Sequence, residues 1–258
     1  MDVNSLFDLT GKVAIVTGGG DGIGRGCSLL LAAAGASVVV SDINGDKAET
    51  VVKEITDNGG KAVAIVCNVL DFNDLQKLTD ATVRQFGAVN ILVNNVGLGG
   101  GGRENPFKID EEYVERIYKI NVFVPLQLCK LTAPLMQKSG YGSIINITST
   151  SSVDKEANMC VYSSSKAALN HLAANLAHDF GSMGVRINNV GPGATRTPAF
   201  AKILTPELEE KMLRQTPLNR LGEVEDIARA VLFFASPASS WISGQILFVN
   251  GGGSQTLN

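Results

Sequence analysis

Short apolar runs recur along the chain, and longer stretches with helical periodicity separate most of them. The runs are apolar on both faces and too short for helices, which is typical of buried parallel strands. The expected strands are residues 13–17, 37–41, 62–66, 91–94, 143–147, 186–190 and 245–249. The expected helices are residues 22–34, 47–58, 71–86, 111–138, 158–181 and 223–235.

This alternation predicts an α/β fold with a doubly wound parallel sheet that is covered by helices on both faces. The chain has 258 residues, of which 45% are hydrophobic, so one domain can bury a large core. No internal repeat and no linker-like segment interrupts the pattern. We therefore expect residues 1–258 to form a single domain.

Two loops follow the carboxyl ends of expected strands, where ligands bind in sheets of this kind. Residues 97–102 contain five glycines, and residues 191–220 contain four prolines with little strand character. We expect residues 191–220 to form a substrate lid, with a short helix that starts after a hydroxyl cap at Thr205 and a first-turn proline at Pro206. The alternative is a passive surface loop.

A glycine-rich turn, residues 18–24, joins the first expected strand to the first expected helix. Glycines are required there when the backbone must approach a pyrophosphate, which then binds at the helix N-terminus. Asp42 ends the second strand, where a carboxylate accepts hydrogen bonds from the adenosine ribose and repels a 2'-phosphate. No Arg or Lys lies between Gly18 and Gly24, and the nearest, Arg25, is equally well explained as a helix-surface residue. NAD(H) is therefore the expected cofactor, in preference to NADP(H).

Tyr162 and Lys166 are four residues apart in an expected helix, and Ser149 lies upstream of them. Positions i and i+4 share a helix face, so the Lys166 ammonium should lower the pKa of Tyr162 from about 10 by ~1 to 3 units. A phenol with a lowered pKa can act as acid and base near neutral pH. The alternative interpretation is a packed tyrosine beside a solvated lysine.

Charge and composition argue against several classes of partner. The formal net charge is −3, which gives no reason to expect nucleic acid or an anionic membrane surface. The N-terminal segment lacks the basic and apolar parts of a signal peptide, and no apolar run is long enough to span a bilayer. We therefore expect a cytoplasmic protein without nucleic-acid or membrane partners.

The four cysteines are scattered along the chain without Cys-x-x-Cys spacing. This pattern predicts buried free thiols in preference to disulfides or a zinc site. His171 and His178 lie on one expected helix with no further ligand nearby, so we expect no metal site.

Taken together, the motifs closely resemble those of the short-chain dehydrogenase/reductase family in order and spacing. The resemblance covers nearly the whole chain and is carried by Thr17–Gly24, Asn94–Gly97, Asn121, Ser149, Tyr162–Lys166 and Pro192–Thr197. It implies a single Rossmann-like domain with a seven-stranded parallel sheet. Such domains usually assemble as tetramers or dimers, and we expect a homotetramer that acts on a small-molecule substrate.

The resemblance also implies a role for each matching residue. Tyr162 is the acid and base, Lys166 lowers its pKa and binds the nicotinamide ribose, and Ser149 polarises the substrate oxygen. Asn121 holds a water that links Lys166 to solvent. The substrate-binding residues are Ser149 and Tyr162, and no metal ligand is implied. The expected cofactor-binding residues are Gly18, Asp21, Gly22, Ile23, Gly24, Asp42, Ile43, Asn68, Val69, Asn95, Gly97, Tyr162, Lys166, Pro192, Gly193, Thr195 and Thr197.

Two positions depart from the family pattern. Asn68 stands where the family commonly has an aspartate that accepts a hydrogen bond from the adenine amino group. The amide carbonyl of Asn68 can accept the same bond, more weakly because it is uncharged. Val96 replaces the usual alanine of the Asn-Asn-Ala-Gly motif and adds two methyl groups near the cofactor.

A narrower resemblance concerns the substrate. Residues 36–44, 205–212, 216–222 and 239–253 look like segments of the bacterial NAD-dependent 7α-hydroxysteroid dehydrogenases, which act on bile acids. A steroid pocket needs apolar walls, and Lys202 and Arg214 could meet a side-chain carboxylate at its rim. The apolar lid residues that could supply the walls are Ala199, Phe200, Ile203, Leu204, Met212 and Leu213. Alternatively, these residues merely pack the lid onto the body or onto a neighbouring subunit.

Three other functions are compatible with the same scaffold. A 3-oxoacyl-thioester reductase typically uses NADPH, so Asp42 counts against it. A sugar or diol dehydrogenase would need several hydrogen-bonding side chains in the pocket to pair the substrate hydroxyls. A non-catalytic, cofactor-binding regulatory protein could discard the reactive side chains, yet Asn121, Ser149, Tyr162 and Lys166 are all present.

Overall fold

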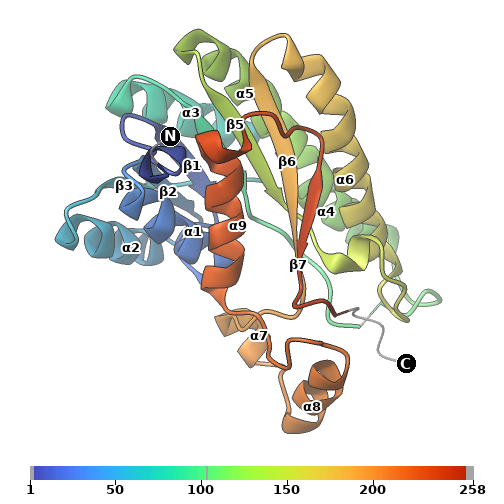
Figure 1. The fold of residues 1–258 in the computed structure, drawn as a ribbon. Helices are drawn as coiled ribbons and strands as arrows, with labels where there is room; N and C mark the ends of the chain where they lie inside the picture. Colours follow the sequence, from blue (N-terminus) through green and yellow to red (C-terminus); the bar gives the residue numbers. More distant parts are fainter. Residues whose placement is uncertain (1–2, 103, 254–258) are drawn as a thin grey trace.

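The computed structural model describes residues 3–102 and 104–253. Within these residues, seven parallel strands form one sheet in the order β3-β2-β1-β4-β5-β6-β7 (Figure 1). The strands are β1 Val13–Thr17, β2 Ser37–Asp42, β3 Lys61–Val66, β4 Ile91–Asn94, β5 Gly142–Ile147, β6 Val185–Pro192 and β7 Ile246–Val249. The predicted fold class, an α/β Rossmann-like doubly wound fold with a seven-stranded parallel sheet, is confirmed.

Nine α-helices and four shorter helical segments connect the strands in the described residues. The α-helices are α1 Gly22–Ala33, α2 Gly45–Asp57, α3 Phe72–Phe86, α4 Glu111–Tyr118, α5 Val124–Ser139, α6 Cys160–Gly181, α7 Pro198–Ala201, α8 Pro206–Arg214 and α9 Val224–Ala235. The shorter segments are η1 Asn4–Leu6, η2 Lys119–Phe123, η3 Thr150–Ser152 and η4 Pro237–Ser239.

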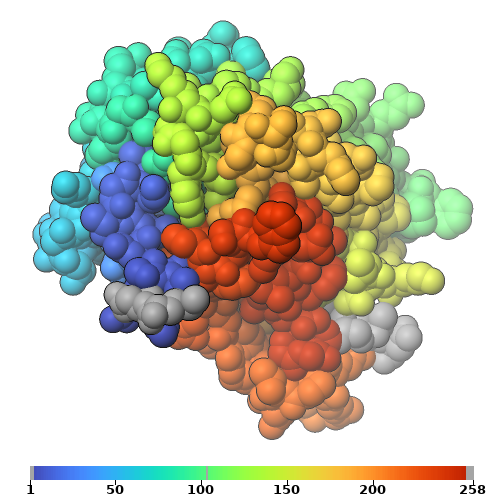
Figure 2. All heavy atoms as spheres, turned by 45° about the horizontal axis from the view of Figure 1, so that its top comes forward, coloured from blue at the N-terminus to red at the C-terminus, as the bar shows by residue number. Residues whose placement is uncertain are grey.

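Two hydrophobic cores lie on opposite faces of the sheet, because successive side chains of a strand point to opposite faces. In β1, Ala14 and Val16 belong to the core covered by α1, α2 and α9, whereas Ile15 belongs to the core covered by α3, α5 and α6. Segments from the two ends of the chain meet on the first face, where α1 packs along α9 and η1 contacts η4 (Figures 1 and 2).

The prediction of one continuous helix over residues 111–138 is wrong, because the helix is interrupted in its middle. The structure has two α-helices joined by η2, a π-helical turn at Lys119–Phe123. Pro125 follows this turn, and its ring nitrogen cannot donate the hydrogen bond that a continuous α-helix requires. A π turn inside a helix is often found at a functional site, and this one carries Asn121.

The other elements start or end within two residues of the predicted bounds. Helix α6 begins at Cys160 instead of residue 158, because Asn158 has φ of 58° and lies in the left-handed region. The short lid helix forms as predicted, with the Thr205 hydroxyl accepting from the Leu208 amide and Pro206 in the first turn. One cysteine prediction is wrong, since Cys160 is exposed while Cys27, Cys67 and Cys129 are buried free thiols. No helix in the described ranges is long and apolar enough to cross a membrane.

Candidate active site

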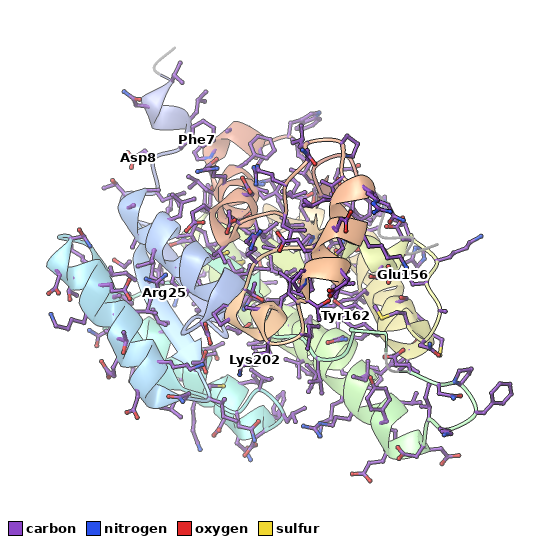
Figure 3. The ribbon with its side chains drawn as sticks, turned by 90° about the horizontal axis from the view of Figure 1, so that it is seen from below. Phe7, Asp8, Arg25, Glu156, Tyr162 and Lys202 are labelled. Atoms are coloured by element: carbon purple, nitrogen blue, oxygen red, sulfur yellow. The ribbon has the colours of Figure 1, made fainter. Side chains whose placement is uncertain are left out.

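A cleft of about 800 Å³ opens at the carboxyl ends of the strands, and residues of α7 and α8 line one side of it. Its walls come from the glycine turn before α1, the glycine-rich loop after β4, the segment after β5, the first turns of α6 and the residues after β6. Figure 3 looks onto this end of the molecule and labels Tyr162, Glu156 and Lys202. The cleft therefore lies where the sequence predicted a ligand site.

Ser149, Tyr162 and Lys166 all line this cleft, although they come from different elements. Ser149 follows β5 and caps η3, where its hydroxyl accepts a hydrogen bond from the Ser151 amide at 3.1 Å. Tyr162 and Lys166 lie in the first two turns of α6. The structure thus brings together the three side chains that the sequence grouped.

The pKa of Tyr162 is raised, contrary to the prediction that Lys166 lowers it. Burial of the phenol raises the pKa most, and a hydrogen bond with Ser149 opposes that effect. The Lys166 Nζ lies 5.8 Å from the centre of the Tyr162 ring and donates to the Ile147 carbonyl at 2.9 Å. The prediction failed because sequence spacing gives the shared helix face but not the cost of removing a phenolate from water.

Lys166 is itself a buried cation, 3% exposed. Burial lowers its pKa from 10.5 to about 8. A shift of that size corresponds to about 3 kcal/mol of penalty for the charged form in the folded state. In the described residues no ion pair of Lys166 offsets the penalty, so the folded protein keeps this ammonium at a cost in stability.

We expect Lys166→Met to raise the free energy of unfolding of the cofactor-free protein by about 1 to 3 kcal/mol at pH 7, because methionine fills the same space without a buried charge. The gain should shrink as pH rises from about 8 toward 10.5, where the wild-type lysine loses its proton in both states. Urea denaturation at pH 7 and pH 10 measures both effects. Lys108→Met, at an exposed lysine, is the matched control. A variant no more stable than the wild type at pH 7 would contradict this account.

Asn121 lies directly beneath the cleft and is fully buried. Its amide group accepts from the Leu98 N–H at 2.9 Å and donates to the Leu98 carbonyl at 2.8 Å and to the Ser165 hydroxyl at 2.9 Å. These bonds join the π turn to the glycine-rich loop and to α6. A Cβ atom on Gly97 would lie 3.1 Å from the Lys166 Nζ and 3.5 Å from the Asn121 Oδ1. Only a glycine at 97 leaves this space open.

The glycine-rich turn forms the opposite end of the cleft, at the N-terminus of α1. Gly18 and Gly22 have positive φ values of 61° and 50°. A Cβ atom on Gly24 would lie 2.0 Å from the Gly18 carbonyl oxygen, so this crossing of the backbone requires glycine. Asp21, Gly22 and Ile23 line the cleft. The turn therefore exposes backbone to the cleft at a helix N-terminus, as a pyrophosphate site requires.

Asp42 lies beside this turn at the end of β2, with one carboxylate oxygen accepting from the Gly20 N–H at 3.0 Å. Ile43 follows and is 70% exposed. The sequence interpretation overlooked a cation here, because Lys47 at the start of α2 packs against the same turn. Its ammonium pairs with Asp21 at 2.6 Å, while Arg25 pairs with Glu54. Both nearby cations already have carboxylate partners.

The other predicted cofactor residues lie at the ends of neighbouring strands. Asn95 lines the cleft and donates to the carbonyls of Thr17 and Gly18 at 3.0 and 3.2 Å. Asn68 and Val69 follow β3, outside the residues that line the cleft, and the Asn68 Oδ1 accepts from the Leu70 N–H at 3.1 Å. Asn68 therefore retains one lone pair for another donor.

The segment after β6 supplies a further wall. Pro192, Gly193, Thr195 and Thr197 all line the cleft. The Thr197 hydroxyl accepts from the Phe200 amide at 3.1 Å, and its methyl group lies 3.7 Å from where a Cβ on Gly22 would stand. Thr197 thus faces the glycine turn across the cleft. The donors and glycines present fit a dinucleotide that extends from Asp42 past the turn to Lys166.

The substrate end of the cleft is mostly apolar. The lid contributes Ala199, Phe200, Ile203, Leu208 and Met212 to the lining. Leu204 and Leu213, which the sequence interpretation placed there, are not lining residues. Lys202 and Arg214 are also absent from the lining, and Arg214 pairs with Glu210 at 2.7 Å.

Two charged side chains that the sequence interpretation missed do line the cleft, Lys155 and Glu156. They lie between η3 and α6, in a segment without a pattern of its own, so only the fold reveals their position. Burial raises the pKa of Glu156. Lys155 is exposed and, among the described residues, adds a positive charge to this end of the cleft.

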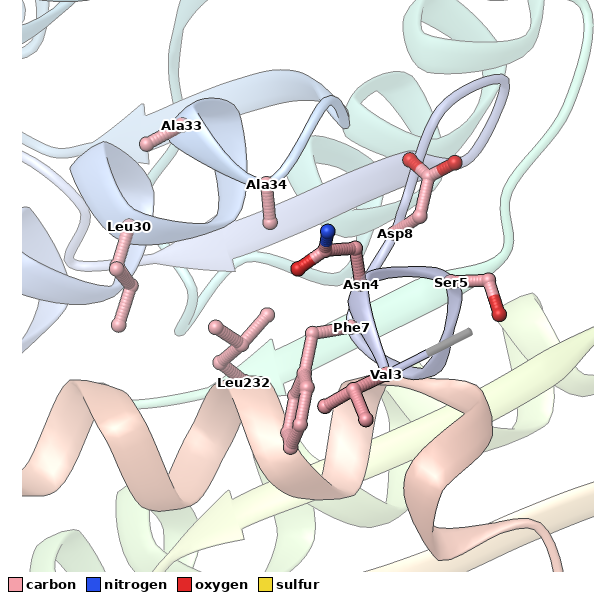
Figure 4. A pocket seen from close by; sticks show the side chains of 9 residues that line it. All are labelled: Val3, Asn4, Ser5, Phe7, Asp8, Leu30, Ala33, Ala34 and Leu232. Atoms are coloured by element: carbon pink, nitrogen blue, oxygen red, sulfur yellow. The ribbon is translucent and has the colours of Figure 1, made fainter. Parts of the chain in front are cut away.

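A second hollow, of about 570 Å³, lies beside η1 and the end of α1 (Figure 4). Val3, Phe7 and Leu232 line it together with the end of α1. None of the residues that the sequence singled out for chemistry contributes to this hollow. The candidate active site is therefore the cleft at the carboxyl ends of the strands.

Comparison with known proteins shows which proteins the chain resembles. A family model described as enoyl-(acyl carrier protein) reductase matches residues 18–254. The 7α-hydroxysteroid dehydrogenase of Escherichia coli (strain K12) is 49% identical over 250 residues, which are 97% of each chain. The 3-oxoacyl-[acyl-carrier-protein] reductase of Thermotoga maritima is 31% identical over 244 residues, 95% of this chain and 98% of the relative.

Among solved structures, a 7α-hydroxysteroid dehydrogenase complexed with NADH and 7-oxo glycochenodeoxycholic acid superposes with a TM-score of 0.96. It is 48% identical to this chain and is covered over its full length, as is this chain. That neighbour binds a dinucleotide and a steroid on the same fold.

Proposed function

Because the chain belongs to the short-chain dehydrogenase/reductase family, we propose that it oxidises the 7α-hydroxyl group of a bile acid with NAD as hydride acceptor. It is an oxidoreductase that acts on CH–OH groups, and the reverse reaction reduces the corresponding ketone. The observation that carries the proposal is the cleft itself, which joins a dinucleotide-binding turn to an apolar pocket across Ser149, Tyr162 and Lys166.

Each reactive residue of the cleft has its own role in the proposed reaction. The Tyr162 phenolate takes the proton of the substrate hydroxyl, and the Ser149 hydroxyl holds the same oxygen by a hydrogen bond. Lys166 binds the nicotinamide ribose, and its ammonium, 5.8 Å from the centre of the Tyr162 ring, offsets only part of the cost of burying the phenolate. NAD held in the cleft would supply, at its nicotinamide C4, the acceptor for the hydride that leaves the carbinol carbon. Asn121 holds a water molecule, through which the proton passes from Lys166 to solvent.

We assign the cofactor-binding residues according to the family resemblance described above. Gly18, Asp21, Gly22, Ile23 and Gly24 hold the pyrophosphate, and Asp42 with Ile43 holds the adenosine ribose. Asn68, Val69 and Asn95 would hold the adenine, and Gly97 would leave room for the nicotinamide ribose. The residues after β6 would hold the nicotinamide carboxamide and the adjoining phosphate; they are Pro192, Gly193, Thr195 and Thr197.

A rigid steroid suits the apolar wall that Phe200, Ile203 and Met212 provide. We propose that residues 191–220 cover it as a lid within one NAD-binding domain of residues 1–258. Lys155 lines the cleft and is exposed, and we propose that its ammonium meets a side-chain carboxylate of the steroid. A sugar or diol would leave its hydroxyls facing this wall without partners.

A 3-oxoacyl-thioester reductase is the second candidate, since a relative of that name covers nearly the whole chain. Its family members typically use NADPH, and the carboxylate of Asp42 would repel the extra phosphate of that cofactor. The completeness of Ser149, Tyr162 and Lys166 weighs against a non-catalytic regulatory protein.

We expect NADH formation from cholic acid and chenodeoxycholic acid, which carry a 7α-hydroxyl, and none from deoxycholic acid, which lacks it. Reduction of a 3-oxoacyl thioester with NADH or NADPH serves as the comparison assay. Turnover of the first two bile acids alone supports the proposal. No activity on any bile acid, with clear turnover of a thioester, diol or sugar, would overturn the substrate assignment and leave only the family.

The protein is proposed to act as a cytoplasmic homotetramer. Large apolar side chains stand exposed at several places on the isolated chain, which is unfavourable unless another subunit covers them. They include Phe123 in η2, Trp241, which is 99% exposed, and Ile246 and Leu247 in β7. Light scattering at micromolar concentration distinguishes four subunits from two.

A further inference from the structure

Glu104 is a buried carboxylate in the segment that joins the glycine-rich loop to α4, and it is 2% exposed. The carboxylate accepts hydrogen bonds from three donors. The Val161 N–H donates to it at 2.7 Å, and the Tyr162 N–H donates at 3.1 Å. The Tyr113 hydroxyl on α4 donates to it at 2.9 Å. These donors satisfy a charge that would otherwise be costly to bury.

The first turn of α6 depends on this carboxylate. The first amides of a helix have no partner within the helix. The residue in the N-cap position of α6, Met159, makes no side-chain capping bond. Glu104, far away in the sequence, accepts from two of these amides instead, and its negative charge lies at the positive end of the helix dipole. One of those amides belongs to Tyr162.

The same contact ties the glycine-rich loop to Tyr162. The Glu104 N–H donates to the Asn158 carbonyl at 2.9 Å. Closer to β4, a Cβ atom on Gly99 would lie 3.0 Å from the Tyr162 ring, and one on Gly100 would lie 3.5 Å from it. The loop therefore packs on the face of the phenol while Glu104 holds the backbone of the same residue.

We propose that Glu104 is a positioning residue, which fixes the first turn of α6 and so holds the Tyr162 hydroxyl at the substrate oxygen. The inference rests on the proposed function of Tyr162 as acid and base. Glu104 does not touch the substrate; it acts through the backbone of Tyr162 and through its charge.

The negative charge of Glu104 also affects the pKa of Tyr162. A residue that only supported the fold would not change that pKa. Within residues 3–102 and 104–253, the polar and charged groups that act on Tyr162 are Lys166 on α6, Ser149 after β5, Glu156 before α6 and Glu104. The charge of Glu104 favours the protonated phenol and raises the pKa of Tyr162, as does that of Glu156. Removing the Glu104 charge should therefore lower that pKa and shift the pH profile of alcohol oxidation to lower pH.

Three variants separate the two effects. Glu104→Gln keeps an oxygen that accepts from the Val161 and Tyr162 amides, and its amide nitrogen can donate to the Tyr113 hydroxyl, so it removes only the charge. Glu104→Ala removes the contacts as well. Glu115→Ala, at an exposed glutamate on α4, is the matched control. Circular dichroism checks that each variant is folded.

We expect Glu104→Ala to lower kcat for chenodeoxycholic acid by at least ~10-fold while KM for NAD changes less than ~3-fold, because it displaces Tyr162 and not the cofactor site. Glu104→Gln should recover most of kcat at alkaline pH. Its Tyr162 pKa, followed by NMR of ¹³C-labelled tyrosine in the cofactor-free protein and assigned with Tyr162→Phe, should fall by at least ~0.5 unit.

The NMR titration needs no substrate, so it decides the role of Glu104 even if the protein does not oxidise bile acids. An unchanged Tyr162 pKa in Glu104→Gln would overturn the proposal, and so would a Glu104→Ala variant with wild-type kcat. If Glu104→Ala does not fold, Glu104→Gln decides alone.

Discussion

Tyr162→Phe should lower turnover by at least ~100-fold while NADH binding stays near the wild-type level, because the variant loses only the hydroxyl that exchanges the proton. The ring remains to pack against Gly99 and Gly100. Steady-state kinetics with chenodeoxycholic acid and fluorescence titration with NADH measure the two quantities separately. Lys166→Ala, in contrast, should weaken both turnover and binding.

Tyr118→Phe provides the matched control, since Tyr118 donates to the Ser164 hydroxyl at 3.0 Å and bridges α4 to α6. It removes a tyrosine hydroxyl from the same region without touching the cleft. Turnover above a tenth of the wild-type value in Tyr162→Phe would mean that another group acts as the base.

The wild-type protein should prefer NAD over NADP by at least ~100-fold in kcat/KM, about 3 kcal/mol, because the Asp42 carboxylate would face the added phosphate at close range. Asp42→Ala should relax this preference. The Ala variant also loses the bond from the Gly20 N–H, so Asp42→Asn is needed to remove the charge while keeping an acceptor. Initial rates with both cofactors measure the preference.

Lys47 makes this test sharper. Its ammonium lies beside the glycine turn and pairs with Asp21 in the wild type, so it could attract a phosphate once Asp42 is neutral. Asp46→Ala, at an exposed aspartate in the first turn of α2, is the control for a general loss of negative charge. Equal efficiency of the wild type with NAD and NADP would contradict the role of Asp42.

Local patterns in the sequence were sufficient to predict the sheet and the grouping of reactive residues. Strands β1 and β4 have the predicted bounds, because an apolar run that is buried on both faces shows in the sequence itself. Ser149, Tyr162 and Lys166 could be grouped because short motifs place them at strand ends and on one helix face. The resemblance to a known family then gave each a role.

Contacts between distant segments could not be predicted in this way. Glu104 caps helix α6 by accepting a hydrogen bond from the Val161 N–H. The two residues are 57 positions apart in the sequence. No periodicity marks such a residue. The bonds of Asn121 to Leu98 and Ser165 likewise join segments that are far apart in the sequence. The pKa of Tyr162 was predicted with the wrong sign because burial is a property of the fold.

The measurement that tests the central claim most directly compares chenodeoxycholic acid with its 7β-epimer, each with NAD and the wild-type protein. The two substrates differ only in the direction of one hydroxyl group, so hydride transfer from C7 in a fixed pocket must distinguish them. We predict NADH formation and a 7-oxo product, identified by mass spectrometry, from the 7α compound alone. Equal turnover of both epimers, or oxidation at another carbon, would contradict the account.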